Sequence, residues 1–417
     1  MRPHVTVIHR ARGIVVPYAD RIDHVSDAVT YVSWSPVADG VPAELAAEVV
    51  TLDDMSEVAA AVRALAQRFG RPERIVALSE FDLLVAAQLR AEFGIAGDRP
   101  DYVLRFRDKL VMGEAVRAAG VSAPDFRAAP DAAAVTEFAR EYGYPLIVKP
   151  RLGAGSAGIL KLDGPADLVR LPDLAAEPYL VQVFCPDGVG AVDGVWTGTE
   201  LGAWSASAYR GACLEFANGG ASLGYIEIDD AVVLEALKEF STSVLIALSN
   251  NVATVFHLEL FLSVVDGVVR PRFLEVAARI AGGETTHMWR EVHGHDLAGS
   301  AVDAQLGRPL AAEPLTDGWV VGELLIHPPV TPPCTVVATH LDVSREYAPY
   351  HLSVPAPGTE ITETFGYVDI GAAFRFRGRS TAEVTEAVRH TVAGFRMDCV
   401  ATPALPDPVL PDPLAVA

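Results

Sequence analysis

The chain has 417 residues, half of them apolar, which is enough for two or three domains with a sizeable buried core. Its formal net charge of −21 at pH 7 argues against nucleic acid or an anionic membrane as the main partner. No apolar run is long enough for a membrane-spanning helix, and the four cysteines lack the spacing of a metal site, so we expect a reduced, cytoplasmic protein that acts on small molecules.

The N-terminal part alternates between predicted strands and helices, which favours a small parallel α/β domain over residues 1–104. No GxGxxG motif follows the first strand, so dinucleotide binding is not favoured. Glu80 and Asp82 lie at the end of the strand predicted at 74–79, which is where open parallel α/β sheets place their ligands. The alternative is that both acids cap the following helix. The predicted elements are a strand at 4–10, a helix from Met55 to Phe69, a strand at 74–79 and a helix from Asp82 to Phe93.

Lysine is scarce, so the position of each lysine invites a question. Lys109 lies early in a helix predicted from Arg105 to Ala119, where a solvated surface lysine is the alternative. Lys149 ends a predicted strand at 143–150 and precedes a glycine-rich loop. Glycines there would let backbone N–H groups approach phosphate oxygens, with Lys149 as a point charge, whereas an ordinary hairpin loop is the alternative. The lysines are Lys109, Lys149, Lys161 and Lys238, and the candidate loop residues are Gly153, Gly155, Ser156, Ala157 and Gly158.

The remaining segments are predicted from periodicity and turn residues. The three histidines after residue 286 are too irregular for a metal site, so we expect satisfied surface histidines. The last seventeen residues hold five prolines, which predicts an extended or disordered tail. The histidines are His287, His293 and His295; the predicted helices are Asp131–Tyr142, Asp230–Leu248, Thr286–Leu306 and Ser380–Phe395, with a strand at 178–184 and successive short strands over 195–228.

Two alternating segments predict a β-hairpin that brings two carboxylates together. Asp266-Gly267 is a strong turn signal between them. A two-residue turn would place Glu259 opposite Leu274, so pairing Glu259 with Glu275 requires a longer loop or a bulge near Pro271. Facing carboxylates repel unless a divalent cation or a proton lies between them, which makes the two glutamates candidate magnesium ligands. A sheet with one solvated face is the alternative.

Four motifs in order resemble the motif series of the ATP-grasp superfamily over roughly residues 75–300 and into the C-terminal portion. The resemblance implies an α/β (α+β) ATP-grasp fold with an N-terminal domain of Rossmann type. The motifs are YPLIVKP at 144–150, the glycine loop with SAG, HLELF at 257–261 and FLEVAARIAGG at 273–283. The implied divisions are 1–104 (N-terminal domain), 105–185 (lid), 186–310 (metal and substrate subdomain), 311–400 (C-terminal α/β subdomain) and 401–417 (tail).

The same resemblance assigns roles to individual residues. Lys109 and Lys149 would contact ATP phosphates, with the glycine loop closing over them, and Glu259 and Glu275 would hold Mg²⁺. Arg279 would bind the substrate carboxylate or its acyl-phosphate. The hinge that reads adenine through its backbone would be Gln182, Val183 and Phe184. The sequence departs from the pattern at Ala277, where asparagine is the usual third metal ligand, and near Asp187, a candidate for the ribose-binding acid.

Within the superfamily, the segment LEVAARIAGG is similar to that of carboxylate-amine ligases that join amino acids into dipeptides. A narrower resemblance is to γ-glutamyl ligases of natural-product pathways, such as the one that joins glutamate to propargylglycine. The resemblance implies an ADP-forming ligase that uses ATP and Mg²⁺ on amino-acid substrates, with a homodimer as the candidate assembly. The alternatives are an ATP-grasp carboxylase that uses bicarbonate and a nucleotide-binding regulator without turnover.

Overall fold

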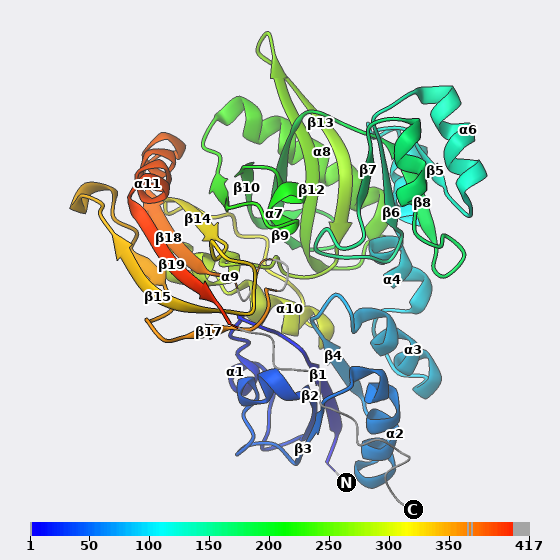
Figure 1. The fold of residues 1–417 in the computed structure, drawn as a ribbon. Coiled ribbons are helices and arrows are strands. Elements are labelled where there is room, and N and C mark those ends of the chain that lie inside the picture. The colour runs from blue at the N-terminus through cyan, green and yellow to red at the C-terminus, as the bar shows by residue number, and fades with distance from the viewer. Residues whose placement is uncertain (1, 365–366, 368–369, 403–417) are drawn as a thin grey trace, which may run out of the picture.

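The computed structural model describes residues 2–364, 367 and 370–402, and these residues form four β-sheets with flanking helices (Figure 1). Most of the predicted irregular tail therefore lies outside the described residues. Within the described ranges, no helix combines the length and apolar character needed to cross a membrane. In Figure 1 the N-terminal sheet lies below the largest sheet, and the two smaller sheets lie on either side of it.

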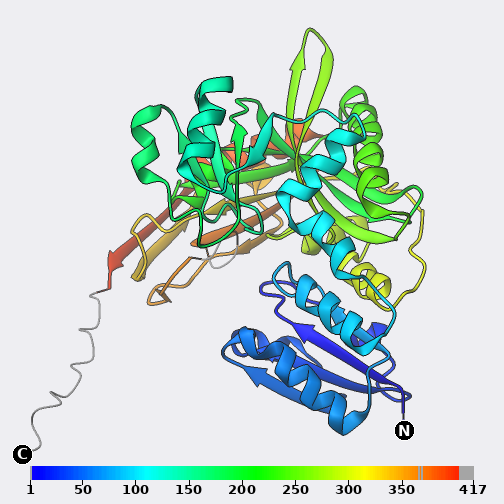
Figure 2. The same cartoon turned by 90° about the vertical axis from the view of Figure 1, so that its right-hand side faces the viewer.

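The N-terminal sheet is parallel with strand order β3-β2-β1-β4, which confirms the predicted α/β arrangement. Every residue of β1 is buried, as expected for a parallel strand covered on both faces. Figure 2 shows the helices that flank this sheet. The strands are β1 (His4–His9), β2 (Ala28–Trp34), β3 (Glu48–Leu52) and β4 (Arg74–Ala77); the helices are α1 (Tyr18–Arg21), α2 (Val58–Phe69) and α3 (Leu83–Phe93), with 3-10 turns η1 (Ser35–Gly40) and η2 (Met55–Glu57).

A second, antiparallel sheet with strand order β5-β8-β6-β7 carries the glycine-rich loop between β6 and β7. The prediction of a single helix from Arg105 to Ala119 is wrong, because the helix is interrupted at Asp108. Asp108 has an extended backbone, and its side chain accepts the Leu110 N–H to cap the second helix. The strands are β5 (Phe126–Ala128), β6 (Leu146–Pro150), β7 (Leu160–Leu162) and β8 (Tyr179–Val183); the helices are α4 (Pro100–Arg107), α5 (Lys109–Ala118) and α6 (Ala132–Tyr142), with η3 (Pro165–Arg170).

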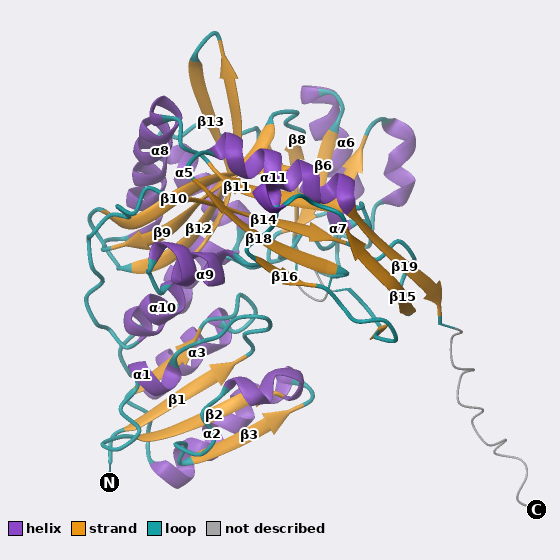
Figure 3. Cartoon of the chain, turned by 90° about the vertical axis from the view of Figure 1, so that its left-hand side faces the viewer, coloured by secondary structure: helices purple, strands orange, loops and turns teal. Residues whose placement is uncertain are grey.

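The largest sheet has eight strands in the order β13-β12-β9-β10-β11-β14-β18-β16. The strands β14, β16 and β18 follow residue 310 in the chain but belong to the same sheet as β9 to β13. The predicted domain boundary at residue 310 stays a prediction. Figure 3 shows the β12–β13 hairpin projecting from this sheet. The strands are β9 (Gly188–Trp196), β10 (Leu201–Arg210), β11 (Ser222–Glu227), β12 (Thr254–Val265), β13 (Val268–Ala277), β14 (Val320–Ile326), β16 (His351–Ser353) and β18 (Ala372–Gly378); the helices are α7 (Cys213–Ala217) and α8 (Ala231–Ser249).

The alternation along β12 gives this sheet one apolar and one polar face. Phe256, Leu258 and Leu260 are fully buried in a core that includes residues of α8 such as Val244 and Leu248. The intervening residues His257 and Glu259 therefore point to the opposite face. The apolar face fixes the strand register, because a shift of one residue would exchange the two sets.

The β12–β13 turn is the predicted Asp266-Gly267, and both residues have positive φ, at 53° and 74°. Glu259 pairs with Glu275 while Leu260 pairs with Phe273, so Leu274 is an extra residue on β13. The predicted bulge is confirmed, but it lies at Leu274, beyond Pro271. The bulge brings the two glutamates opposite each other.

The region after β13 departs most from prediction. The prediction of one helix from Thr286 to Leu306 is wrong. The segment forms α9, a π-helical turn and α10, and Gly294, in the left-handed conformation (φ 67°), separates the last two. His293 is not a surface histidine: its side chain is 3% exposed and contacts Glu227 and Asp317. The elements are α9 (Thr285–Met288), the π-helical turn η4 (Trp289–His293), α10 (Leu297–Gln305), β15 (Cys334–Leu341), η5 (Arg345–Tyr347), β17 (Glu360–Ile361), α11 (Thr381–Gly394) and β19 (Phe395–Ala401).

Candidate active site

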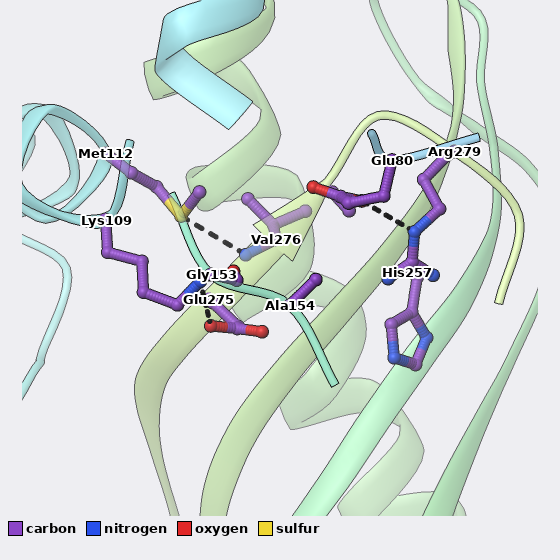
Figure 4. Close-up of a pocket in the computed structure, with 10 residues that line it drawn as sticks. Glu80, Lys109, Met112, Gly153, Ala154, His257, Glu275, Val276 and Arg279 are labelled. Atoms are coloured by element: carbon purple, nitrogen blue, oxygen red, sulfur yellow. Dashed lines mark hydrogen bonds and ion pairs between the residues drawn. The ribbon is translucent and has the colours of Figure 1, made fainter. Parts of the chain in front are cut away.

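A small cavity lies where the polar face of the eight-stranded sheet meets the glycine-rich loop and the N-terminal domain (Figure 4). The structure brings the sequence-predicted residues Lys109, Gly153, Glu275 and Arg279 to this cavity. A second cavity shares Lys109 and adds Lys149 and Gln182. The first is lined by Glu80, Lys109, Met112, Gly153, Ala154, His257, Glu275, Val276, Ala277 and Arg279, and the second by Lys109, Gly113, Ala123, Phe126, Lys149, Leu180, Gln182, Phe273 and Leu274.

Two lysines surround the carboxylate of Glu275. The Lys109 Nζ lies 3.0 Å from the Glu275 Oε2 and also donates to the Gly153 carbonyl at 2.7 Å. Burial alone would raise the pKa of Glu275, but the positive charges of Lys109 and Lys149 outweigh it and lower that pKa to about 2. Lys149 is only 4% exposed, and burial lowers its pKa to about 8 despite the attraction of Glu275. Glu275 is therefore an ionised carboxylate beside two lysines.

The break between α4 and α5 attaches the N-terminal half of the site to the start of the glycine-rich loop. Arg107 Nη2 donates to the Leu152 carbonyl at 2.8 Å, and Lys109 N donates to the Arg151 carbonyl at 3.0 Å. Asp108 accepts two bonds from Arg151, from Nε at 2.9 Å and from Nη2 at 2.5 Å. Three consecutive residues thus hold the first three residues of the loop, which explains why the helix is interrupted there.

The loop backbone needs its glycines. Gly155 and Gly158 have positive φ, at 59° and 70°, and so does Ser156, at 61°. A Cβ on Gly158 would lie 2.9 Å from the Pro150 Cγ. The chain can therefore turn back over β6 only with a glycine at this position.

Glu80 links Arg279 to the rest of the site. The Arg279 Nε donates to the Glu80 Oε2 at 2.7 Å, and Arg107 contacts the other Glu80 oxygen. Burial would raise the pKa of Glu80, but the charges of Arg279 and Arg107 outweigh it and lower that pKa. Glu80 therefore serves the site as an ion-pair partner and is not a helix cap. The strand does not extend to Arg279, because β13 ends at Ala277 and Arg279 lies in a bend.

The other predicted metal ligand, Glu259, belongs to a buried polar network that sequence analysis missed. The Tyr209 hydroxyl donates to the Glu259 Oε1 at 3.2 Å, and the His257 Nε2 lies 3.7 Å from the same oxygen. The His257 Nδ1 lies 2.7 Å from the Asp193 Oδ1, and the Tyr225 hydroxyl donates to Asp193 at 2.5 Å. Burial would lower the pKa of His257, but Asp193 and then Glu259 raise it to about 10.

The alternation in HLELF predicts that His257 and Glu259 share one strand face, because residues two apart lie on the same side, and the structure confirms this. The partner Asp193 lies on β9, and nothing local in the sequence pairs β9 with β12. His257 also pairs across the sheet with Ala277, where the usual asparagine is absent. Within the described ranges, no group of three or more His, Cys, Asp or Glu side chains is arranged to hold a metal ion, so the predicted magnesium site rests on two carboxylates.

The predicted hinge is partly occupied by bonds within the protein. The Val183 amide donates to the Asp125 carbonyl at 2.9 Å, and the Phe184 amide donates to the Pro145 carbonyl at 3.1 Å. An adenine ring would therefore have to use carbonyl groups or a later amide. Asp187, the candidate for the ribose, forms an ion pair with Arg272 at 2.7 Å.

The C-terminal strands anchor the loop that follows Arg279. The Glu284 amide donates to the Glu323 Oε2 at 2.5 Å, and Arg375 contacts the Glu284 carboxylate. A Cβ on Gly283 would lie 2.6 Å from the Glu323 Oε1, and Gly283 has a φ of 62°, so a larger residue would displace the carboxylate and strain the backbone. Burial raises the pKa of Glu323 to about 8, although the Glu284 amide acts in the opposite direction. Sequence analysis gave no signal for this anchor, because its partners are 39 residues apart or more.

No family model matches the chain. Over 89 residues, which are 21% of this chain and 22% of the relative, the chain is 32% identical to the L-arginine-specific L-amino acid ligase of Bacillus subtilis. The match thus spans about a fifth of that relative's length.

Two solved structures resemble nearly the whole chain. An L-amino acid ligase from Bacillus licheniformis superposes with a TM-score of 0.72 at 17% identity, covering 95% of this chain and 98% of that one. The biotin carboxylase domain of the Hydrogenobacter thermophilus 2-oxoglutarate carboxylase, solved with MgADP, ADP and bicarbonate, gives a TM-score of 0.68 at 15% identity, covering 96% and 91%. At such low identity these likenesses establish the fold alone.

The raised pKa of Glu323 predicts a pH-dependent stability. Because this pKa is about 8 in the folded chain and 4.5 ordinarily, the protonated carboxyl stabilises the fold, fully below pH 4.5 and no longer above about pH 8. Glu323→Gln keeps an oxygen for the Glu284 amide but does not titrate. Its melting temperature should exceed that of the wild type by a margin that grows between about pH 5 and pH 8.5.

Thermal unfolding followed by circular dichroism across this pH range measures the margin. Glu386→Gln is the control, because Glu386 is an exposed carboxylate whose pKa is lowered by a hydrogen bond from Arg389. If the difference in melting temperature between Glu323→Gln and the wild type does not change with pH, the pKa of Glu323 is not raised in the folded protein.

Proposed function

We propose, from the premise that the chain has the ATP-grasp fold, that it is an ATP-dependent, ADP-forming carboxylate-amine ligase. The acid would be an amino acid, and the amine another amino acid, giving a dipeptide or a γ-glutamyl dipeptide. The observation that supports this most directly is the cavity in which Lys109, Glu275 and Arg279 meet the glycine-rich loop. One site then offers groups for a triphosphate beside a guanidinium for a carboxylate.

The phosphates of ATP would lie between the lysines and the glycine-rich loop. Lys149 is buried at the end of β6 near the Glu275 carboxylate. Lys109 reaches that carboxylate from α5. Their charges would stabilise negative charge on the transferring phosphoryl group. The second cavity, which holds Lys149 and Gln182 among apolar side chains such as Phe273, suits the flat adenine ring.

Glu259 and Glu275 fit a Mg²⁺ ion, because magnesium in nucleotide sites is commonly bound by one or two carboxylates together with substrate phosphates. When bound, the ion would neutralise charge on the phosphates of ATP. Ala277 offers no third side-chain ligand, so water or phosphate oxygens would complete the coordination. The low pKa of Glu275 keeps that carboxylate ionised at neutral pH.

Arg279 would bind the carboxylate that is activated. Its Nε and Nη1 donate to Glu80 and to the Ile280 carbonyl, which leaves further N–H groups of the guanidinium for a ligand in the cavity. The reaction would begin with attack of the carboxylate oxygen on the γ-phosphorus of ATP, giving an acyl-phosphate and ADP. The amine nitrogen would then attack the acyl carbon, expel phosphate and lose a proton, leaving an amide.

An ATP-grasp carboxylase is the second candidate, because the chain resembles the biotin carboxylase domain nearly as well as the ligase. Radiolabelled bicarbonate distinguishes the two: a ligase releases ADP with amino acids and fixes no label. A nucleotide-binding regulator would bind ATP without releasing ADP under either condition.

Lys149→Met should raise the KM for ATP or abolish turnover, because it removes the buried charge assigned to the phosphates. The melting temperature should stay within a few degrees of the wild-type value, because methionine has nearly the volume of lysine and Lys109 still compensates Glu275. Lys238→Met, at an exposed position on α8, is the control. Steady-state ADP release measures the effect, and unchanged ATP kinetics in Lys149→Met would refute the assignment.

Glu275→Gln should lose the magnesium-dependent part of nucleotide binding. For the wild type, ATP with Mg²⁺ should raise the melting temperature more than ATP with EDTA, because a ligand that binds only the folded state stabilises it. In Glu275→Gln the two shifts should be equal. Glu235→Gln, exposed on α8, should behave as wild type. A full magnesium effect in Glu275→Gln would rule out this ligand.

Arg279→Lys should lower kcat by roughly a hundredfold if the guanidinium stabilises developing charge, as oxyanion donors do. Hydroxylamine in place of the amine provides the assay, because it traps the acyl-phosphate as a hydroxamate. The variant should bind ATP but form little hydroxamate, whereas Arg270→Lys, exposed near the hairpin turn, should form it normally. Wild-type hydroxamate formation by Arg279→Lys would show that Arg279 has no part in activation, and a loss of stability alone would indicate a structural ion pair with Glu80.

A further inference from the structure

Unpaired polar atoms gather at one place in the N-terminal domain. Eight buried side-chain nitrogen or oxygen atoms in the described part of the chain have no hydrogen-bond partner, and four of them belong to His9, Arg10 and Asp82. His9 is the last residue of β1 and Arg10 follows it, while Asp82 lies after β4, the parallel neighbour of β1. Because unpaired buried polar groups are costly and rare, such a concentration requires an explanation.

Asp82 occupies the cap position of α3 without capping it. An aspartate at this position normally accepts a backbone N–H of the first turn, but the Asp82 side chain makes no such bond. Its Oδ1 lies 3.1 Å from the Arg10 Nη2 instead, and the side chain is 1% exposed. Asp82 is therefore directed toward the loop that follows β1. Burial raises its pKa to about 6 even though Arg10 acts in the opposite direction, so Arg10 compensates the carboxylate only in part.

Arg10 connects this buried acid to the surface. Its side chain is 23% exposed, and its guanidinium carbon lies 5.8 Å from the centre of the Phe81 ring. Phe81 is itself 49% exposed, which is unusual for a large aromatic side chain. The partly exposed Arg10 guanidinium is therefore the side of the pair that a ligand would meet first.

The pair is linked along the chain to the cavity that holds Arg279. Glu80, which binds Arg279 and lines that cavity, is two residues from Asp82 in the same loop. The loop after β1 also contacts the segment after Arg279, because His287 lies 2.8 Å from the Gly13 carbonyl and Arg290 donates to the Val15 carbonyl at 2.9 Å. The loops that follow β1, β4 and β13 thus meet at the carboxyl edge of the parallel sheet, where α/β folds bind ligands.

The charges at this position match an amino acid. A guanidinium and a carboxylate side by side complement the carboxylate and ammonium groups of a zwitterion. A polyanion would be repelled by Asp82, and a simple amine would leave Arg10 without a new partner. We propose that Arg10 and Asp82 bind the α-carboxylate and α-ammonium groups of an amino-acid substrate. The inference rests on the proposed ligase function.

The zwitterion has two possible sources. It is either the amino acid that supplies the amine, or the distal end of an acid substrate that is activated at its side-chain carboxylate. Hydroxylamine separates them, because it replaces the amine and leaves the acid in place. If Arg10→Gln impairs hydroxamate formation, the subsite holds the acid; if it impairs only amide formation with an amino acid, the subsite holds the amine.

The test compares Arg10→Gln and Asp82→Asn with the wild type. ADP release and product mass are measured with the twenty L-amino acids as substrates. Alanine and ethylamine are compared as the amine. Loss of a charge-assisted hydrogen bond should raise the KM for the zwitterionic substrate roughly tenfold or more with kcat largely kept. Kinetics with ATP should not change. If alanine is the bound partner, both variants should also lose the wild-type preference for alanine over ethylamine.

Arg63→Gln is the matched control, because Arg63 forms an exposed ion pair with Glu92 in the same domain. Asp82→Asn keeps the shape of the side chain, so it carries the test if Arg10→Gln does not fold. Unchanged KM values for every amino acid in both variants would overturn the proposal. Equal losses for all substrates together with a lower melting temperature would also overturn it, because a structural ion pair predicts that pattern.

If the wild type releases no ADP with any pair of amino acids, the proposed function fails, and the subsite is judged by binding alone. Calorimetric titration of the wild type with each of the twenty L-amino acids should then show binding that Arg10→Gln and Asp82→Asn lose. Absence of binding to the wild type, or equal binding to the variants, would overturn the subsite independently of turnover.

Discussion

The site depends on placing two carboxylates opposite each other on adjacent strands. Glu259 and Glu275 repel, and the arrangement is tolerated because cations lie around it: Lys109 within 3.0 Å of Glu275, and Lys149 buried nearby. The cations in turn are costly to bury without the acids. The acids and the lysines thus stabilise each other's burial, and in the proposed function this charged cluster would bind the phosphates of ATP with Mg²⁺. The single extra residue Leu274 in β13 creates this pairing.

Short connections transmit that geometry to the other parts of the molecule. Arg107, Asp108 and Lys109 hold the base of the glycine-rich loop, and Arg107 also contacts Glu80, which holds Arg279. A displacement of the loop would therefore move Arg279 through the ion pairs of Arg107 with Glu80 and of Glu80 with Arg279. In the proposed function, this linkage would make the position of the loop over the phosphates depend on the placement of the substrate carboxylate.

Local patterns in the sequence predicted the local parts of the structure. The alternation around Glu259 and the Asp266-Gly267 turn gave the hairpin, and scarcity singled out Lys149 at the end of its strand. The sequence could not locate the bulge at Leu274, because the registers on either side of it satisfy the same alternation. It also could not show the break at Asp108, because that break is stabilised by Arg151, 43 residues away. Partners distant in the chain, such as Asp193 for His257, leave no local pattern.

The position of Arg279 shows why the fold needs all of its parts. The arginine follows the last residue of β13, its Nε is held by Glu80 of the N-terminal domain, and the loop beyond it is bound by Glu323 of β14. Separate units therefore fix one guanidinium, although none of them contains a complete binding site. Because a bend has no strand register to orient its side chains, orientation must come from these outside contacts. If Arg279 binds the substrate carboxylate as proposed, that carboxylate would bind only when the N-terminal sheet and the large sheet are correctly placed, so substrate recognition would depend on the assembly of the fold.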